Sequence, residues 1–337
     1  MHGMPLTLLL SGALPPAELA GELIHALDAP VLRRWLQRAA PVDHRSVIGS
    51  TGDAAWIAAH LFGLEAGAVA PTAPYAWAAL TGDASGSSTI WHADPIHVAI
   101  GRDSLIVHPL EGALPIDDEA DALIAAANDC LAGSDAELRR CGAHWFLHTA
   151  HAWAMQPPPL DAILGAAFTL PDADADAGEA RRWSRLHNAI QMSWHEHLVN
   201  QQREADGAPP INALWLHGGG RWATLRALRW PHVFSDQPLV RGAAQAAGAA
   251  VHSTADAWAG DALVDLPRAL PAARVSDWSS WPAAMTALDR ELERAPADHP
   301  IELVLTTRDR IRSWLVQPTD WLRFWRRNEL AAALAAK

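Results

Sequence analysis

The sequence predicts an α/β fold with a second, β-rich subdomain inserted into the middle of the chain. Apolar runs of strand length alternate with stretches of helical apolar spacing at both ends of the 337 residues, and the middle is richer in strand-like segments. Half of the residues are hydrophobic, so the chain can bury a large core. We therefore expect an α/β core formed by residues 1–85 and 180–337, with an inserted α+β subdomain over residues 86–179.

Apolar runs and their boundaries predict the elements of the core. The run over residues 6–10 ends at Ser11 and Gly12 and predicts a buried strand followed by a turn. Pro30 interrupts a helical pattern and predicts a helix start, because its fixed φ suits a first turn. Further strands are expected over residues 213–216, 262–266 and 301–306, and further helices over 56–62, 180–204, 238–249 and 281–293. The runs expected to share one sheet are 6–10, 213–216, 263–266 and 301–305.

Within the expected insertion, residues 89–98 and 104–107 predict a strand pair, and residues 144–153 predict further strands. A helix expected over residues 115–131 begins with three acidic residues, which favour the positive end of a helix dipole. An acidic link over residues 172–179 leads back to the core.

Composition excludes several classes of function. The formal charge of −12 argues against a general nucleic-acid binder, and no apolar run approaches the ~20 residues of a membrane span. A cytoplasmic protein is therefore expected. The single lysine, Lys337, leaves no internal lysine for a Schiff base, a pyridoxal cofactor or a phosphate-binding Walker loop. Cys130 and Cys141 are too few for a disulfide scaffold and are expected to be structural.

Residues 200–221 read NQQREADGAPPINALWLHGGGR, in which a helix end, a Pro-Pro turn, an apolar run and three glycines follow one another. This segment resembles hpvN..R...G.ppaN.iwlwG.G of the archaeal-type cofactor-independent phosphoglycerate mutases, which belong to the alkaline phosphatase superfamily. The matching positions are Asn200, Arg203, Gly207, Pro210, Asn212, Leu214, Trp215, Leu216, Gly218 and Gly220. The chain also resembles the group of phosphoglycerate-mutase-like or RpfE-type regulatory proteins. The resemblance implies an alkaline-phosphatase-like three-layer sandwich with a smaller β-rich inserted subdomain.

The same resemblance implies that the family's chemistry has been lost. These mutases hold two divalent metals on carboxylate and histidine ligands beside a nucleophilic serine. Ser11 stands where the family has aspartate, and Ala54 or a near neighbour stands where the serine is expected. Leu160 replaces a histidine, and Arg308 occupies the neighbourhood of a late ligand. Residues 263–266 are followed by proline, without the family's next ligand motif. We expect no metal and no cofactor, and the sequence assigns no catalytic residue.

The best remaining candidate is a ligand-binding segment of five residues, His217, Gly218, Gly219, Gly220 and Arg221. Glycines allow a ligand to approach the backbone, exposed amides can bind an anion, and the forked cation of Arg221 suits phosphate or carboxylate. The same residues also suit a tight turn with no ligand. The expected partners are a small phosphorylated or carboxylate ligand or another protein, and neither nucleic acid nor a membrane.

Two histidine groups leave alternatives open. His144, His148 and His151 would share one face of a helix, as a zinc site needs, but not one face of the expected strands. Asp94 and His97, together with His92, could supply a catalytic dyad, although a turn-capping aspartate explains Asp94 equally well. The leading expectation is a catalytically silent scaffold acting in ligand binding or regulation. The alternative is an active phosphomutase or phosphatase with divergent metal ligands.

Overall fold

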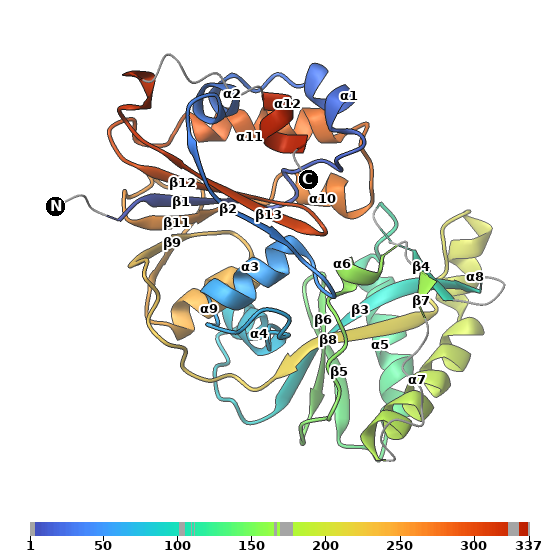
Figure 1. Cartoon of the computed structure of the whole chain (residues 1–337). Coiled ribbons are helices and arrows are strands. Elements are labelled where there is room, and N and C mark those ends of the chain that lie inside the picture. Colours follow the sequence, from blue (N-terminus) through green and yellow to red (C-terminus); the bar gives the residue numbers. More distant parts are fainter. Residues whose placement is uncertain are drawn as a thin grey trace. The chain divides into compact units, whose positions relative to one another are not determined.

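The computed structural model of the chain describes residues 4–100, 105–108, 110, 112–164, 167–168, 178–322 and 330–335. The chain divides into two compact units. Unit 1 comprises Met1–Ala68 and Thr224–Lys337, and unit 2 comprises Val69–Ala223 (Figure 1). Both boundaries predicted for the insertion, at 85/86 and 179/180, fall within unit 2. The reason is that residues 213–220 pair with the inserted strand over residues 90–96, and the helix over residues 179–195 packs on the inserted helix over residues 117–131.

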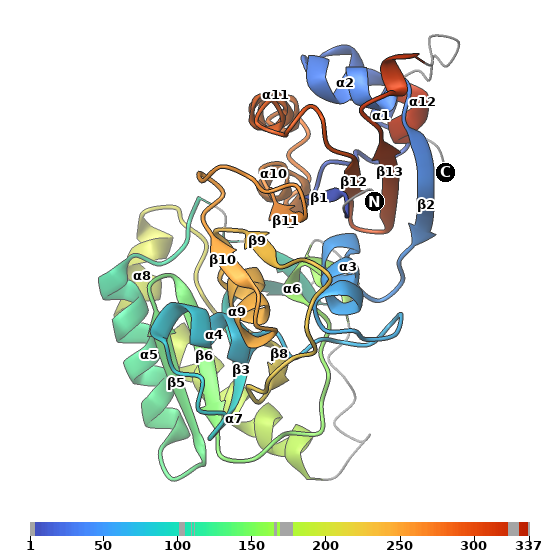
Figure 2. The ribbon, with the colours of Figure 1, turned by 90° about the vertical axis from the view of Figure 1, so that its left-hand side faces the viewer.

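Unit 1 is built on a seven-stranded sheet in the order β10-β9-β11-β1-β12-β13-β2. The bounds are β1 Leu6–Leu10, β2 Ala40–Ser46, β9 His232–Phe234, β10 Ala250–His252, β11 Ala262–Asp265, β12 Ile301–Thr306 and β13 Arg310–Val316. The first five strands in this order are parallel, whereas β13 runs antiparallel to both β12 and β2. Strands β10 and β2 form the two edges of the sheet (Figure 2).

Helices cover both faces of this sheet and make unit 1 a three-layer sandwich. Leu6, Leu8 and Leu10 point to one face and Leu9 to the other, as the alternation of a strand requires. The first face packs against α1 Ala20–His25, α2 Pro30–Leu36, α10 Leu270–Arg274, α11 Trp281–Leu292 and α12 Leu330–Ala335. The second face packs against α3 Gly52–His60 and α9 Pro238–Ala246 (Figure 1). The predicted α/β fold class is therefore confirmed.

Unit 2 contains a six-stranded sheet in the order β5-β6-β3-β4-β7, with β8 also paired to β3. The strands are β3 Thr89–Ile100, β4 Leu105–His108, β5 Ala136–Cys141, β6 His144–Thr149, β7 Ala167–Phe168 and β8 Ala213–Gly220. The helices are α4 Ala73–Thr81, α5 Asp117–Leu131, α6 Leu160–Ile163, α7 Glu179–His195 and α8 Leu198–Ala205. Helices α5 and α7 bury an apolar cluster against one face of the sheet.

Three sequence expectations can be compared directly with these elements. The strand pair expected over residues 89–98 and 104–107 is confirmed as antiparallel β3 and β4. The run over residues 213–216 was expected to share one sheet with residues 6–10, 263–266 and 301–305. This expectation is wrong, because β8 pairs with β3 in the sheet of unit 2. The helix expected over residues 180–204 is two helices, since His197 accepts a hydrogen bond from the amide of Val199 and starts α8.

Two further regions lie outside the elements expected from the sequence. No helix was expected over Ala73–Thr81, where α4 lies. Most of the acidic link expected over residues 172–179 lies outside the described residues. None of the helices in the described part of the chain combines the length and apolar character needed to cross a bilayer.

Candidate functional site

Buried polar side chains gather at the carboxyl ends of the parallel strands of unit 1. Ser11 follows β1, Ser235 follows β9, Asp265 ends β11 and Thr306 ends β12, and all four are buried. Open α/β sheets bind ligands outside the carboxyl ends of their strands, because the connecting loops diverge there. This carboxyl edge of unit 1 is therefore the first candidate site.

Asp265 is the acidic group of this edge that lies within a strand. The Ser235 hydroxyl donates a hydrogen bond to Asp265 Oδ2 at 2.8 Å. Burial raises the pKa of the Asp265 carboxyl to about 7, and the nearby charges of Asp53 and Asp236 act in the same direction. A carboxyl that holds its proton up to neutral pH can act as a hydrogen-bond donor to a ligand.

Backbone hydrogen bonds fix the loop that follows β1 to the end of β12. The amide of Gly12 donates to the Thr306 hydroxyl at 3.3 Å, and that of Leu14 donates to the Thr306 carbonyl at 3.0 Å. The buried Arg310 donates through Nη2 to the Pro15 carbonyl at 2.8 Å. A guanidinium charge is thus held inside the fold next to this loop.

The N-terminus of α3 is joined to the same connection between β12 and β13. The amide of Gly52 donates to the Thr307 carbonyl at 3.0 Å. A side chain at Gly52 would lie 2.5 Å from the carbonyl oxygens of Thr307 and Arg310, so this position requires glycine. Thr51 is the N-cap residue, and its buried hydroxyl has no hydrogen-bond partner among the described residues. The resemblance places Ala54 or a near neighbour where the family has its serine nucleophile, and the N-cap side chain of α3 is that of Thr51.

The donors at the carboxyl edge do not fit the pair of divalent metals that the resemblance implies. Two adjacent metals need several carboxylate or imidazole ligands, whereas the strand ends provide three hydroxyls and Asp265. The carboxylates of Asp53 and Asp236 are near enough to raise the pKa of Asp265 but are not grouped with it as ligands of one ion. Within the described ranges, no three His, Cys, Asp or Glu side chains are grouped so that they could hold a metal ion. The carboxyl of Asp265 is moreover engaged by Ser235.

Residues 217–220, which also suited a tight turn, belong to a strand instead, and Arg221 follows it. β8 extends through Gly220 and pairs with β3, with an irregular register between Ile90 and His92. A Cβ atom on Gly219 would lie 2.2 Å from the Trp91 ring, and one on Gly220 would lie 2.4 Å from Pro71. Gly218 has φ +58° and is pressed in the same way against Thr72. The three glycines therefore have a packing role.

Arg221 directs its guanidinium at its own chain. Nη2 donates to the Ala150 carbonyl at 2.9 Å, and Nε donates to the Thr89 hydroxyl at 3.4 Å. These contacts connect the residue after β8 to the start of β3 and to the residue after β6. The Arg221 guanidinium was expected to bind an anion, but its Nη2 and Nε atoms already donate hydrogen bonds to Ala150 and Thr89.

The structure brings together His217, Asp94 and His92, which the sequence placed in separate candidates. His217 Nε2 lies 2.7 Å from Asp94 Oδ2, and the His92 ring stacks on His217 with 4.7 Å between centroids. Burial, and then the neighbouring His217, lowers the pKa of His92 to about 3, so its imidazole is neutral at physiological pH. The cluster joins β3 to β8 by polar contacts.

The zinc alternative finds no support in the described residues. His144 and His148 lie on β6, whereas His151 follows that strand. Burial lowers the pKa of His148 to about 4, and its Nδ1 lies 3.4 Å from the Ser88 hydroxyl.

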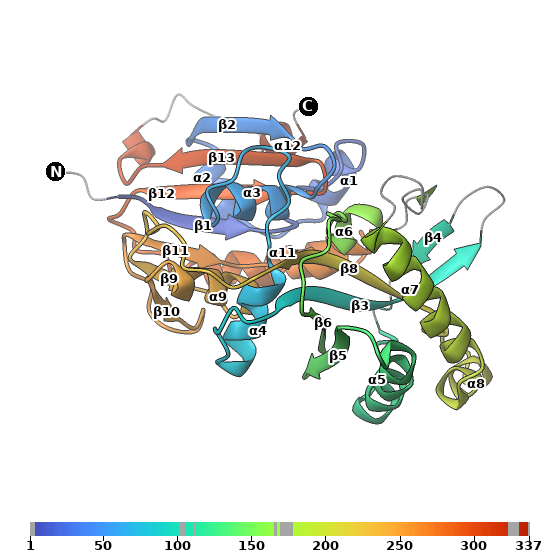
Figure 3. The ribbon, with the colours of Figure 1, turned by 90° about the horizontal axis from the view of Figure 1, so that it is seen from below.

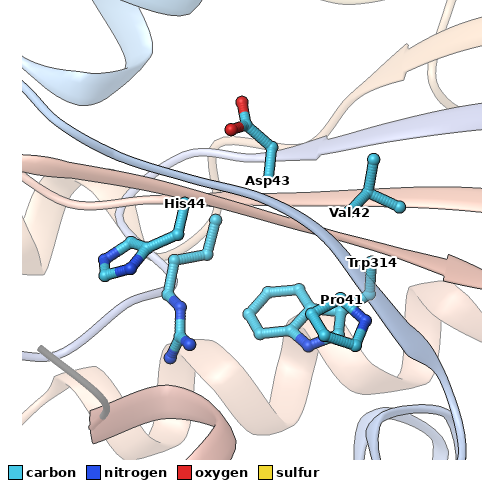
Figure 4. Close-up of a pocket in the computed structure, with 6 residues that line it drawn as sticks. Pro41, Val42, Asp43, His44 and Trp314 are labelled. Atoms are coloured by element: carbon cyan, nitrogen blue, oxygen red, sulfur yellow. The ribbon is translucent and has the colours of Figure 1, made fainter.

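A shallow pocket beside the edge strand β2 was not anticipated from the sequence. Six residues line it, namely Pro41, Val42, Asp43, His44, Arg312 and Trp314 (Figure 4). The Arg312 guanidinium lies 5.2 Å from the centre of the Trp314 ring and donates to the Ala333 carbonyl of α12. The Arg312 guanidinium therefore already has two contacts within the chain, the Trp314 ring and the Ala333 carbonyl.

Comparisons with known proteins give a fold and no assigned activity. No family model and no curated protein matches the sequence. The structure is similar to the PH0037 protein from Pyrococcus horikoshii, with a TM-score of 0.57 and 13% identity over 99% of this chain and 93% of that chain. It is also similar to a cofactor-independent phosphoglycerate mutase from Thermoplasma acidophilum DSM 1728, with a TM-score of 0.45, 14% identity, and coverage of 99% and 95%. The similarity to PH0037 shows a shared fold.

Proposed function

We propose that this chain is a phosphoglycerate-mutase-like protein that no longer performs two-metal phosphoryl transfer and acts by binding a ligand. The observation that carries the proposal is the donor set at the carboxyl edge of unit 1. Hydroxyls of Ser11, Ser235 and Thr306 occupy three strand ends, and the carboxyl of Asp265 keeps its proton to about its pKa of 7. Such groups donate hydrogen bonds and do not neutralise a transferring phosphoryl group as two metals would.

The chemistry of this edge favours a small phosphorylated or carboxylate ligand. The Ser11 and Thr306 hydroxyls and a protonated Asp265 carboxyl can donate to anionic oxygens, whereas the Ser235 hydroxyl already donates to Asp265. The N-terminus of α3 contributes a positive dipole end. The buried Arg310 adds a full positive charge near the loop after β1. The strand end from His217 to Arg221 stays the second proposed ligand site, with Arg221 as its cation.

Thermal denaturation in a phosphate titration distinguishes these two sites. We expect phosphate or 3-phosphoglycerate to raise the melting temperature of the wild type, and Ser11→Ala to reduce that rise. Arg221→Ala should keep it, because this guanidinium contacts Ala150 and Thr89. The opposite result, with Arg221→Ala abolishing the rise and Ser11→Ala preserving it, would place the ligand at the end of β8.

Enzyme assays test the absence of catalysis. Interconversion of 2- and 3-phosphoglycerate should stay undetectable with added Mn²⁺, Co²⁺ or Zn²⁺. Turnover in the ordinary enzymatic range of ~1 to 10³ s⁻¹ would contradict the proposal.

One observation favours a second candidate, an active phosphotransferase with divergent ligands. At the start of α3 the Thr51 hydroxyl is buried, and no group in the described part of the chain hydrogen-bonds it. A hydroxyl in such a position can serve as a nucleophile. If turnover is detected, Thr51→Val should abolish it while leaving the fold intact, because valine has the same shape.

A further inference from the structure

A buried histidine of α7 accepts a hydrogen bond from the backbone of β8. The Leu214 amide donates to His187 Nε2 at 3.3 Å, and His187 is 8% exposed. A backbone amide can only donate, so Nε2 must present its lone pair, and the single proton of the neutral ring lies on Nδ1. The contact therefore fixes both the charge and the tautomer of His187.

The bonded amide belongs to a strand with one free edge. Among the described strands, β8 pairs with β3 alone, and the residue opposite Leu214 is Pro95, which has no amide hydrogen. The amide of Leu214 is bonded instead by α7. A backbone group left unpaired at a buried edge is costly, and an open edge is a template for pairing with another chain. His187 thus closes this position of the edge.

Helix α7 also covers apolar side chains next to this contact. Ile190 is fully buried and belongs to one cluster with Leu214 and Leu216 of β8 (Figure 3). The Trp183 ring lies beside the His187 ring, with 5.2 Å between centroids. The imidazole is therefore largely shielded from water while α7 stays in place.

The surroundings of His187 do not favour a charged ring. Burial lowers the pKa of His187 to about 4, and no charged side chain among the described residues contributes to that shift. The titratable and charged groups of the elements around it are Asp117, Asp118, Glu119, Asp121, Asp129 and Cys130 on α5, Arg182, Arg185 and His195 on α7, and His217 on β8. A proton taken up by His187 therefore gains no compensating charge from these groups.

We propose that protonation of His187 releases α7 from the free edge of β8, which makes this residue a pH-sensitive switch within unit 2. A proton on Nε2 turns the acceptor into a donor that faces the donating Leu214 amide, so the hydrogen bond is lost and a buried charge is created. Opening of α7 returns the charged ring to water. All the residues involved lie in unit 2, so this proposal and the ligand site of unit 1 can fail independently.

The direction of the pH dependence follows from the pKa of His187. The folded pKa of about 4 lies below the ordinary value of 6.5, so between these values the open state binds more protons than the closed state. The contribution of His187 to keeping α7 closed is therefore full above about pH 6.5 and decreases as the pH falls to 4.

Hydrogen exchange of the Leu214 amide measures this opening directly. After correction for the pH dependence of an unprotected amide, its protection should fall about ten-fold or more between pH 7 and pH 5, since each pKa unit is worth a factor of ten. In His187→Gln, the amide oxygen of glutamine can accept the same hydrogen bond and does not titrate. The protection of Leu214 in this variant should be nearly independent of pH over the same range.

His195→Gln is the matched control, because His195 is exposed in the last turn of the same helix, and this variant should behave as the wild type. An equal fall in His187→Gln, or no fall in the wild type, would overturn the proposal. The amides of β6 are a second readout, because the buried His148 of that strand also titrates in acid. They should keep their protection at pH 5, and their loss together with Leu214 would show that the whole sheet opens and that α7 is not released on its own.

A direct view of the imidazole keeps the test decisive if His187→Gln does not fold. Nuclear magnetic resonance of the ring nitrogens in the wild type at pH 7 should show His187 neutral, with its proton on Nδ1. A proton on Nε2 would contradict the hydrogen bond on which the switch depends.

Discussion

At the carboxyl edge of unit 1, single buried side chains decide what kind of ligand can be held. Asp265 has lost contact with water, and its carboxyl is paired with the neutral hydroxyl of Ser235. Thr51 and Ser11 add hydroxyls where the resemblance leads one to expect a nucleophile or a metal ligand. The result is an edge rich in hydrogen-bond donors and poor in ligands for a metal.

The pKa of Asp265 gives a pH-dependent difference in stability. The folded pKa of about 7 lies above the ordinary value of 3.8, so between these values the folded state binds more protons than the unfolded state. The contribution of Asp265 to the free energy of unfolding is therefore full below about pH 4 and decreases as the pH rises to 7. At about 1.36 kcal/mol per pKa unit, the loss is up to about 4 kcal/mol.

Urea denaturation of wild type and Asp265→Asn at several pH values between 4 and 8 measures this contribution. Asparagine cannot ionise, so the variant should lose less stability than the wild type as the pH rises. Parallel pH profiles for the two proteins would show that Asp265 is ionised in the folded state throughout.

Gly219 tests whether the triple glycine is needed for packing. In Gly219→Ala the new methyl group would meet the buried Trp91 ring, so we expect a loss of about 1–3 kcal/mol in unfolding free energy. Gly21→Ala is the matched control, because nothing lies within 4 Å of that position in α1, and alanine there should stabilise by about 0.5–1 kcal/mol. Unchanged stability of Gly219→Ala would free the glycines for a ligand role.

At the scale of elements, residues of the segment that carries the family resemblance hydrogen-bond to the backbone on either side of β8. The buried Asn200 donates to the carbonyls of Trp194 and Ile211 and accepts from the Ile211 amide. Asn212 exchanges two hydrogen bonds with the backbone of Val98 in β3. Asn200 and Asn212 therefore hold the strand β8 against β3 and against the helices that precede it.

Arg203 bonds three acceptors in different parts of unit 2. Its guanidinium bonds Glu119 and the carbonyls of Ala113 and Pro209, and its side chain is buried. Arg203→Met should lower the unfolding free energy by about 2–4 kcal/mol, because several buried acceptors lose their donor. Arg139→Met is the control, since the pair of Arg139 with Glu137 is about half exposed and should contribute under about 1 kcal/mol. Equal losses of unfolding free energy for the two variants in chemical denaturation would show that the hydrogen bonds of Arg203 contribute no more than a surface ion pair.

Local patterns were sufficient for elements whose apolar spacing agrees with their final environment. The runs that became β1, β11 and β12 are mostly apolar and buried on both faces, which is typical of parallel strands. The partner of β8 could not be predicted, because the run at 213–216 is equally apolar and pairing with β3 is a nonlocal choice. The start of α3 was misplaced because contacts of Gly52 with Thr307 and Arg310 fix it.

In the candidate site, too, single residues could be predicted from the sequence but their partners could not. Asp265 could have been found as a carboxylate ending an apolar strand, but its partner Ser235 lies 30 residues earlier. The pairing of His217 with Asp94 spans 123 residues and depends on the register of β3 with β8. The sequence shows which residues could take part in a site, but which of them lie together depends on how the strands pair.

At the scale of the whole molecule, two units with different properties share one chain. Unit 1 contains the three-layer sandwich with its polar carboxyl edge, and unit 2 carries most of the net negative charge. Such a division suits a protein in which one unit binds a small ligand and the other opens in acid. The central claim, however, concerns unit 1 alone, namely that it lacks a two-metal centre.

Metal analysis by mass spectrometry tests that claim most directly. The protein should be purified without an affinity tag or chelator, incubated with Mn²⁺, Co²⁺ or Zn²⁺, and passed through a gel-filtration column before measurement. We expect well under one equivalent of metal per chain, because no described group of ligands can hold one. Two retained equivalents per chain would contradict the account and would identify the protein as a phosphotransferase scaffold with its metal centre intact.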